Sequence, residues 1–161
     1  MVEQIGISAK EASYELGKFT TYDKNKVLKM VADALLANEK KILEANQLDI
    51  DEAKKNNVKP ALIDRLMLNS QRIQGMVDSI HQIISLEDPV GEVVGGVKRP
   101  NGLVISQKRV PMGVIGFIYE ARPNVTVDAF ALCFKSGNVV ILNIEVHDEP
   151  TIEEVLLDEY K

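Results

Sequence analysis

The sequence has little cysteine, no long apolar run and no basic excess, and each absence removes a class of protein. Its only cysteine, Cys133, cannot form an intramolecular disulfide, which agrees with a reducing compartment. No apolar run approaches the roughly 20 residues that span a bilayer, and the N-terminus lacks a secretory signal pattern, so we expect a cytoplasmic protein with no membrane partner. The 161 residues, 45% of them hydrophobic, suffice for one domain with its own core.

Common cofactor and metal motifs are also missing. The sequence contains no GxGxxG fingerprint, no P-loop and no Cys/His cluster with metal-ligand spacing, so we expect no metal site. The net charge of −5 is uneven, because residues 144–161 carry seven acidic residues and one lysine, which leaves +1 for residues 1–143. A nearly neutral body has no electrostatic footprint for nucleic acid, so we expect no nucleic-acid partner.

The first ninety residues have the apolar periodicity of helices. Thr20 and Thr21 are candidate N-caps, Asn56–Asn57 mark a stop, and Pro60 fits the first turn of a further helix. An apolar stripe with helical spacing follows at Ile73, Met76, Val77, Ile80, Ile83 and Ile84. We therefore predict helices with a structural role over most of 8–87.

The pattern changes to β-branched residues near Pro89. Between two such runs stands "PNG" at Pro100–Gly102, and Asn-Gly is a strong hairpin signal because both residues tolerate positive φ. We predict a β-hairpin that pairs roughly Glu92–Arg99 with Leu103–Val110.

After the hairpin, the sequence reads as strand, helix and strand. "GVIGFIYE" is largely apolar, as in the middle of a parallel sheet, the helix ends at Gly137, and "VVIL" is a second buried strand. A unit of this length predicts a right-handed βαβ crossover with parallel strands near 113–119 and 138–142.

The turn "YEARPN" follows the first of these strands. Ligands of doubly wound sheets bind beyond the carboxyl ends of the strands, so the turn places Glu120, Arg122 and Asn124 at the rim of a cleft. Asn124 can donate its side-chain amide to an oxyanion, and Arg122 can pair with phosphate or carboxylate. The alternative, which the spacing alone favours, is a polar loop in which Asn124 caps a helix starting near Val125 or Thr126.

The segment "RVPMGVIGFIYEARPNVTVDAFALCFKSGNVVIL" closely resembles the gamma-glutamyl phosphate reductase (glutamate-5-semialdehyde dehydrogenase) family of the aldehyde dehydrogenase superfamily. "ILEANQLDIDEAKKNNV", "LIDRLMLNSQRI" and "DPVGEV" look like the family's N-terminal region in the same order, so the resemblance covers about residues 8–142. It implies an α/β fold made of N-terminal helices and a βαβ portion of a Rossmann-like cofactor domain, with a protruding hairpin. Residues 1–143 would form a partial cofactor-binding domain, and 144–161 an acidic tail without family resemblance.

The resemblance also implies a reaction, in which the family reduces L-glutamyl 5-phosphate with NADPH to glutamate 5-semialdehyde and phosphate, in proline biosynthesis. A cysteine in a separate catalytic domain forms the thiohemiacetal and thioester. By analogy Asn124 is the candidate oxyanion donor, with Arg122 a rival for that position. Tyr119, Glu120 and Arg122 are candidate residues for binding NADP(H). The hairpin at about 92–110 resembles an oligomerisation arm, so we expect a homo-oligomer.

Two departures from the family limit these expectations. "VILN" runs into "IEVHDEP", where the family has an arginine and a glycine pair near the cofactor, so we expect impaired NADP(H) binding. The family's nucleophile lies in a part of its chain that has no counterpart here. Cys133 falls between apolar neighbours in a helix, where a thiol is inert, and Lys135 and Ser136 fit a helix end better than a phosphate site. His81 has no second ligand or base in view.

Three functional hypotheses follow. The chain is the N-terminal part of an NADPH-dependent reductase and inactive alone, or a non-catalytic oligomerisation or interaction module, or one half of a split enzyme.

The tail segment "TIEEVLLDEYK" predicts a short acidic helix with Thr151 as its N-cap. We expect this helix to pack weakly on the sheet edge or on a neighbouring chain, with disorder as the alternative.

Overall fold

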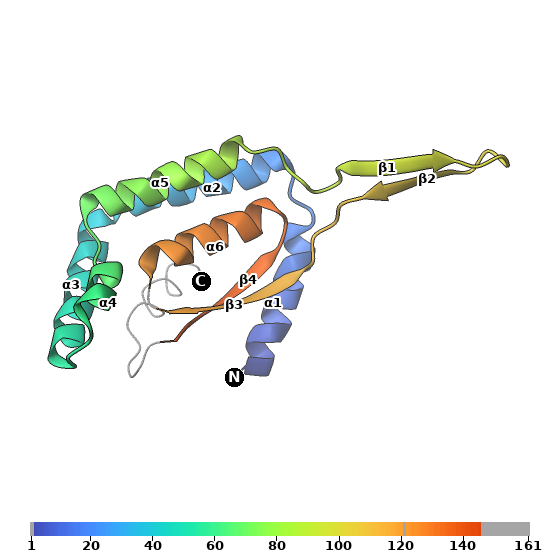
Figure 1. The fold of residues 1–161 in the computed structure, drawn as a ribbon. Coiled ribbons are helices and arrows are strands. Elements are labelled where there is room, and N and C mark those ends of the chain that lie inside the picture. The colour runs from blue at the N-terminus through green and yellow to red at the C-terminus, as the bar shows by residue number, and fades with distance from the viewer. Residues whose placement is uncertain (1, 121, 146–161) are drawn as a thin grey trace.

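The computed structural model describes residues 2–120 and 122–145, and within them the chain forms helices, a hairpin and a second, parallel strand pair (Figure 1). The helices are α1 (Val2–Leu16), α2 (Thr21–Ala37), α3 (Glu39–Lys55), α4 (Pro60–Leu66), α5 (Ser70–Ser85) and α6 (Pro123–Lys135). The strands are β1 (Val93–Lys98), β2 (Val104–Lys108), β3 (Val114–Glu120) and β4 (Val139–Glu145). This order confirms the predicted mixed α/β fold.

Local signals place the helix ends. Thr20 accepts a hydrogen bond from the Asp23 amide while the Asp23 carboxylate accepts one from the Thr20 amide, so α2 begins with a reciprocal capping box. Asn69 caps α5 by accepting a 2.8 Å bond from the Arg72 amide. Pro60 occupies the first turn of α4, as predicted from its missing N–H.

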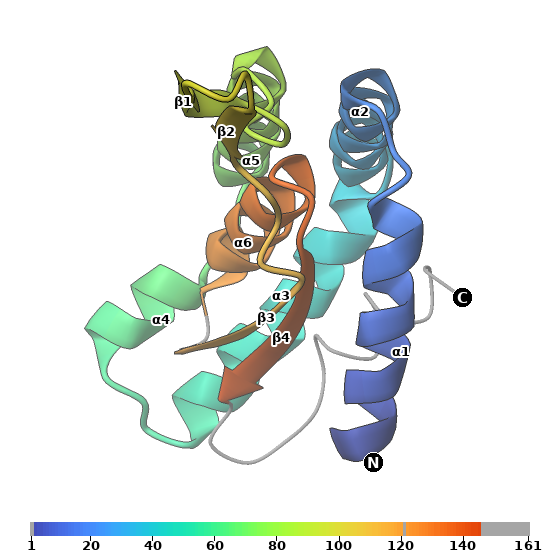
Figure 2. The same ribbon diagram turned by 90° about the vertical axis from the view of Figure 1, so that its right-hand side faces the viewer.

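The core lies where α2 and α5 pack side by side on α6, as Figures 1 and 2 show. Leu28 of α2 and Ile80 of α5 are fully buried, and the other buried members of this cluster are Ala32, Val77, Ile83 and Ala131. Burying one such large aliphatic side chain contributes about 1.5–3 kcal/mol, so the cluster holds these three helices together. The predicted apolar stripe of α5 is therefore confirmed as a core face.

Strands β3 and β4 pair in parallel, and α6 connects them along the chain. The register runs from Val114 opposite Val139 to Glu120 opposite Glu145, which confirms the predicted βαβ unit. The predicted end of the second strand near residue 142 was too early, because pairing with β3 continues through Glu145. Main-chain pairing thus carries the strand past the point where the family-like sequence ends.

The β1–β2 hairpin extends away from the rest of the molecule (Figure 1). Its turn lies at the predicted position: Gly102 has a φ of +86°, and the Arg99 amide donates a 2.8 Å bond to the Leu103 carbonyl. Apolar side chains along it face solvent, with Val93 57% and Val104 69% exposed.

The predicted acidic helix from Thr151 lies outside the described residues. Among the helices that the structure does describe, none combines the length and the apolar character needed to cross a membrane.

Candidate functional site

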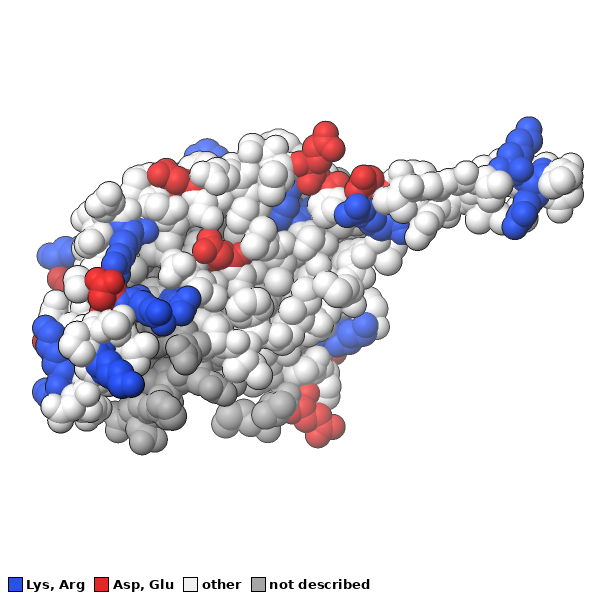
Figure 3. All heavy atoms as spheres, viewed as in Figure 1, with Lys and Arg blue, Asp and Glu red and all other residues white. Residues whose placement is uncertain are grey.

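A pocket with a volume of about 460 Å³ opens where α4 and α5 meet the start of α6. Its charged and amide side chains are Asp64, Arg65, Arg72, Arg122, Asn124 and Asp128. Lys and Arg side chains gather on the end of the molecule formed by α3 and α4 (Figure 3). With three arginines and two aspartates, the pocket has a small positive excess that suits an anionic ligand.

Pro123 determines how α6 enters this pocket. Its ring disfavours the helical conformation for the preceding residue, and Arg122 is extended, with φ −136° and ψ 97°. Pro123 then fills the first helical position, so Asn124 lies within the first turn of α6. The prediction of a helix starting near Val125 or Thr126 with Asn124 as its cap was therefore wrong, and the Asn124 amide remains available to the pocket.

The structure brings two of the four predicted site residues together. Arg122 and Asn124 are both exposed and both line the pocket. Tyr119 does not line it, because its hydroxyl lies 2.5 Å from the Thr126 hydroxyl at the contact between β3 and α6. Glu120 is the last residue of β3.

Arg72 braces a turn that lines the pocket. Its guanidinium donates to the main-chain carbonyls of Asp64 and Met67 and lies 3.3 Å from the Asp64 carboxylate. Asn46 of α3 supports the same turn, because its amide donates to the Leu66 carbonyl and its oxygen accepts from an amide of the turn, at 2.9 and 2.7 Å. The end of α4 is therefore held in place by side chains from two other helices.

The other pocket residues differ in whether they have partners. Ser79 of α5 donates a 2.8 Å hydrogen bond to Asp128 of α6, which links the two helices across the pocket wall. Within the described part of the chain, neither Arg65 nor Arg122 makes a side-chain hydrogen bond or ion pair. Sequence reasoning missed Arg65, Arg72 and Asp128 as site residues; their only signal was membership of the family-like segments.

The segment "FKSGN" at the far end of α6 belongs to a buried polar cluster. Lys24 is 2% exposed, and its ammonium lies 2.5 Å from the Asp88 carboxylate and donates to the Lys135 carbonyl. Lys135 is 3% exposed and donates to Asn25 and to the Ile84 carbonyl, at 2.7 and 3.0 Å. Both ammonium groups are buried and hydrogen-bonded within the protein, which agrees with a structural role for Lys135.

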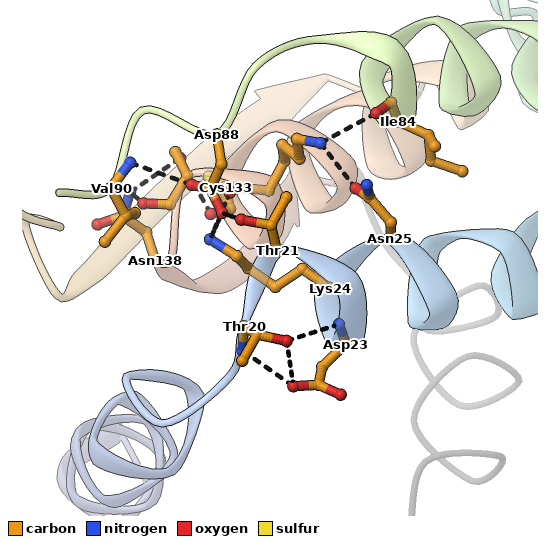
Figure 4. Close-up of polar contacts among 12 residues, drawn as sticks. Thr20, Thr21, Asp23, Lys24, Asn25, Ile84, Asp88, Val90, Cys133 and Asn138 are labelled. Carbon is orange, nitrogen blue, oxygen red and sulfur yellow. Dashed lines mark hydrogen bonds and ion pairs between the residues drawn. The ribbon is translucent and has the colours of Figure 1, made fainter. Parts of the chain in front are cut away.

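The charged groups in this cluster shift one another's pKa values. Figure 4 shows Thr21 and Lys24 of α2 converging on Asp88. Burial opposes the charged form of Asp88, but hydrogen bonds from Lys24, the Val90 amide and Thr21 outweigh it and lower the pKa of the carboxyl. Burial lowers the pKa of Lys135, and the Asp88 charge partly offsets that effect.

Asn138 and Gly137 complete the junction between α6 and β4. The Asn138 side-chain oxygen accepts a 2.9 Å bond from the Gly113 amide at the start of β3. Gly137 has a φ of +76°, and a Cβ there would lie 2.9 Å from Cγ of Pro111. These residues serve the fold and lie at the opposite end of α6 from the pocket.

Cys133 is 8% exposed, and burial raises the pKa of its thiol. The neutral, buried thiol is a poor nucleophile, which agrees with the prediction that it is inert. His81 is exposed on α5. Among the described residues, no three histidine, cysteine, aspartate or glutamate side chains come together as metal ligands.

No family model matches the chain. It is 60% identical over 141 residues to gamma-glutamyl phosphate reductase of Lachnospira eligens, an alignment that covers 88% of this chain and 34% of that protein. The crystal structure of gamma-glutamyl phosphate reductase from Thermotoga maritima superposes with a TM-score of 0.83 at 46% identity, over 84% of this chain and 33% of that one. A probable aldehyde dehydrogenase from Listeria monocytogenes shares the fold, with a TM-score of 0.58 at 16% identity. The chain thus spans about a third of the length of the curated relatives it matches.

Proposed function

We propose that this chain, a homologue of gamma-glutamyl phosphate reductase in the aldehyde dehydrogenase superfamily, supplies part of the cofactor domain of a cytoplasmic enzyme that reduces L-glutamyl 5-phosphate to glutamate 5-semialdehyde with NADPH. The observation that carries the proposal is the 60% identity over 88% of the chain. The pocket supports it independently, because it gathers the two residues of the "RPN" turn that suit acyl chemistry, Arg122 and Asn124.

Asn124 is the proposed oxyanion donor. Its amide lines the pocket from the first turn of α6 and is not consumed by helix capping. A positioned neutral donor of this kind stabilises charge that develops on an acyl oxygen in the transition state. Arg122 stands two residues earlier at the same rim and is the rival for this role.

NADP(H) is proposed to bind at the carboxyl end of β3, near Tyr119, Glu120 and Arg122. Such sites lie beyond the strand ends in doubly wound sheets. The contact between Tyr119 and Thr126 fixes the junction of β3 with α6, so it positions this rim whether or not the tyrosine touches the cofactor. With two strands in the described parallel sheet, we expect binding by the chain alone to be weak.

The 161-residue polypeptide by itself is proposed to be inactive. Thioester chemistry needs an activated thiolate, whereas the one cysteine of this sequence is buried and its pKa is raised. Turnover would then require a catalytic cysteine from elsewhere, either in the same longer chain or in a separate one as in a split enzyme.

A chimera tests the proposal. The aligned 141 residues of the Lachnospira eligens reductase are replaced by those of this chain, and NADP-dependent oxidation of glutamate 5-semialdehyde in phosphate is measured. We expect activity in the chimera and none in the chain alone. Within the chimera, Asn124→Ala should lower kcat by about 10²–10³-fold, whereas Gln82→Ala on the exposed face of α5 should not. A folded chimera without activity would reject the proposal, and an unchanged kcat for Asn124→Ala would transfer the oxyanion role to Arg122.

A homo-oligomer formed through the hairpin is the second part of the proposal. Val93, Val104 and Ile105 are 57%, 69% and 44% exposed on a two-stranded ribbon whose outer edges are unpaired within the described chain. Sedimentation equilibrium should detect dimers or larger species, with Val104→Lys weakening association and Gln107→Lys on the same strand serving as the control. A monomer at every concentration would count against this assembly.

A further inference from the structure

We infer that the pocket binds the amino-acid end of the glutamyl substrate. In this arrangement the Asp128 carboxylate accepts hydrogen bonds from the α-ammonium group, and Arg65 pairs with the α-carboxylate. The inference rests on the proposed function, because it takes Asn124 as the group that faces the acyl carbon. It assigns Asp128 and Arg65 as the residues that determine specificity for the α-ammonium and α-carboxylate groups of that substrate.

The spacing along α6 matches the length of the substrate. Asn124 and Asp128 are four residues apart on one helix, and both line the pocket. Side chains at this spacing lie on one face with Cβ atoms about 5–6 Å apart. In an extended glutamyl group, the acyl carbon and the α-nitrogen are joined by a chain of bonds, each about 1.5 Å long, and this chain spans a similar distance. A substrate lying along the first turns of α6 thus meets Asn124 with one end and Asp128 with the other.

Asp128 supplies the negative charge that an ammonium group requires. Its carboxylate is half-buried, and one of its oxygens accepts the 2.8 Å bond from the Ser79 hydroxyl. That bond orients the carboxylate without neutralising it, and no described lysine, arginine or histidine forms an ion pair with Asp128. A partly buried carboxylate is stabilised by a cation that supplies charge-assisted hydrogen bonds, which an α-ammonium group does.

Arg65 provides the complementary charge. It lies in the last turn of α4, lines the same pocket and has no side-chain partner among the described residues. A guanidinium binds a carboxylate through two parallel hydrogen bonds. Arg72 differs, since both of its terminal guanidinium nitrogens contact Asp64 or Met67, so it holds the turn that carries Arg65. Arg72 therefore braces the turn, whereas Arg65, which that turn carries, is available to a ligand.

A titration of the 161-residue chain followed by ¹H–¹⁵N NMR tests the inference with three probes. L-glutamate carries both charged groups of the zwitterion, glutarate lacks the ammonium group, and 4-aminobutyrate lacks the α-carboxylate. We expect L-glutamate to shift amide signals at 64–68 and 122–128 and to bind about 10-fold or more tightly than either analogue, as for the loss of one charge-assisted hydrogen bond.

Two variants separate the charges. Asp128→Asn should remove the preference for L-glutamate over glutarate, and Arg65→Gln should remove the preference for L-glutamate over 4-aminobutyrate. Lys26→Gln and Asp33→Asn, which change exposed charges on α2, should alter neither preference. If a variant fails to fold, the ranking of the three probes on the unmodified chain still decides the question.

Equal binding of all three probes, or shifts that avoid the pocket amides, would overturn the inference. The chimera's turnover separates this failure from that of the proposed function. An active chimera whose parent chain shows no glutamate preference rejects only the recognition site. Glutamate-selective binding by the chain combined with a folded, inactive chimera rejects only the assignment of the reaction.

Discussion

Replacing Asp88 by Asn should destabilise the protein more than any other single change of surface or loop charge. Asp88 lies in the loop after α5, and its side chain is 10% exposed. It is the counter-charge of Lys24 at 2.5 Å, and its charge also favours the protonated form of Lys135. The substitution keeps the shape of the side chain but removes the one anion that the described residues place beside the two buried ammonium groups.

The expected cost follows from the burial of the pair. Removing one partner of a buried ion pair costs about 3–5 kcal/mol, because the other charge stays buried and uncompensated. At about 2–4 °C per kcal/mol for a chain of this size, Tm should fall by about 6–20 °C. Such a loss is a large share of a typical folding free energy of about 5–15 kcal/mol.

Far-UV circular dichroism melts and urea titrations at pH 7 measure this loss. The matched control is Asp33→Asn, which breaks an exposed pair with Lys29 at 3.0 Å and should cost less than about 1 kcal/mol. Adding Lys24→Met to Asp88→Asn should recover part of the loss, because it removes one of the two stranded charges. A fall in Tm for Asp88→Asn no larger than that of the control would refute the reasoning.

Three further predictions follow from the same region. The folded-state pKa of Asp88 is below its ordinary value of 3.8, so the stability that its carboxylate adds is complete above pH 3.8 and is lost as pH falls through the folded pKa. When the free energy of unfolding is measured as a function of acid pH, Asp88→Asn should therefore lose less stability than the unmodified protein. Gly137→Ala should cost about 1–3 kcal/mol for its φ of +76°, and more if Pro111 cannot move, so an unchanged urea midpoint would contradict the assignment. The Cys133 thiol should react with a thiol reagent much faster in urea than in the native protein, and fast native labelling would show that it is accessible.

Features specified by neighbouring residues were predictable from the sequence. The capping residue Thr20, the stop at Asn56, the hairpin turn at Asn101 and the apolar stripe of α5 all lie where the sequence predicted them. Each depends on interactions within a few residues: a side chain that caps a nearby amide, a backbone angle that few residues tolerate, or a period that places apolar groups on one face. The start of α6 is the local exception, where the preference of Pro123 for the first turn outweighed the capping preference of Asn124.

Tertiary structure alone decided which distant residues meet. Lys24 and Lys135 are joined by a hydrogen bond across 111 positions of sequence, and the pocket brings Arg65 to Asn124 from another helix. No local pattern encodes such a meeting, because it depends on how α4, α5 and α6 pack once their apolar faces are buried. The sequence by itself determined the helices of the apolar-periodic region and the hairpin turn. Packing then decided that Lys135 is a buried structural cation, and that Arg65 and Asp128, neither of which forms an ion pair among the described residues, line the same pocket.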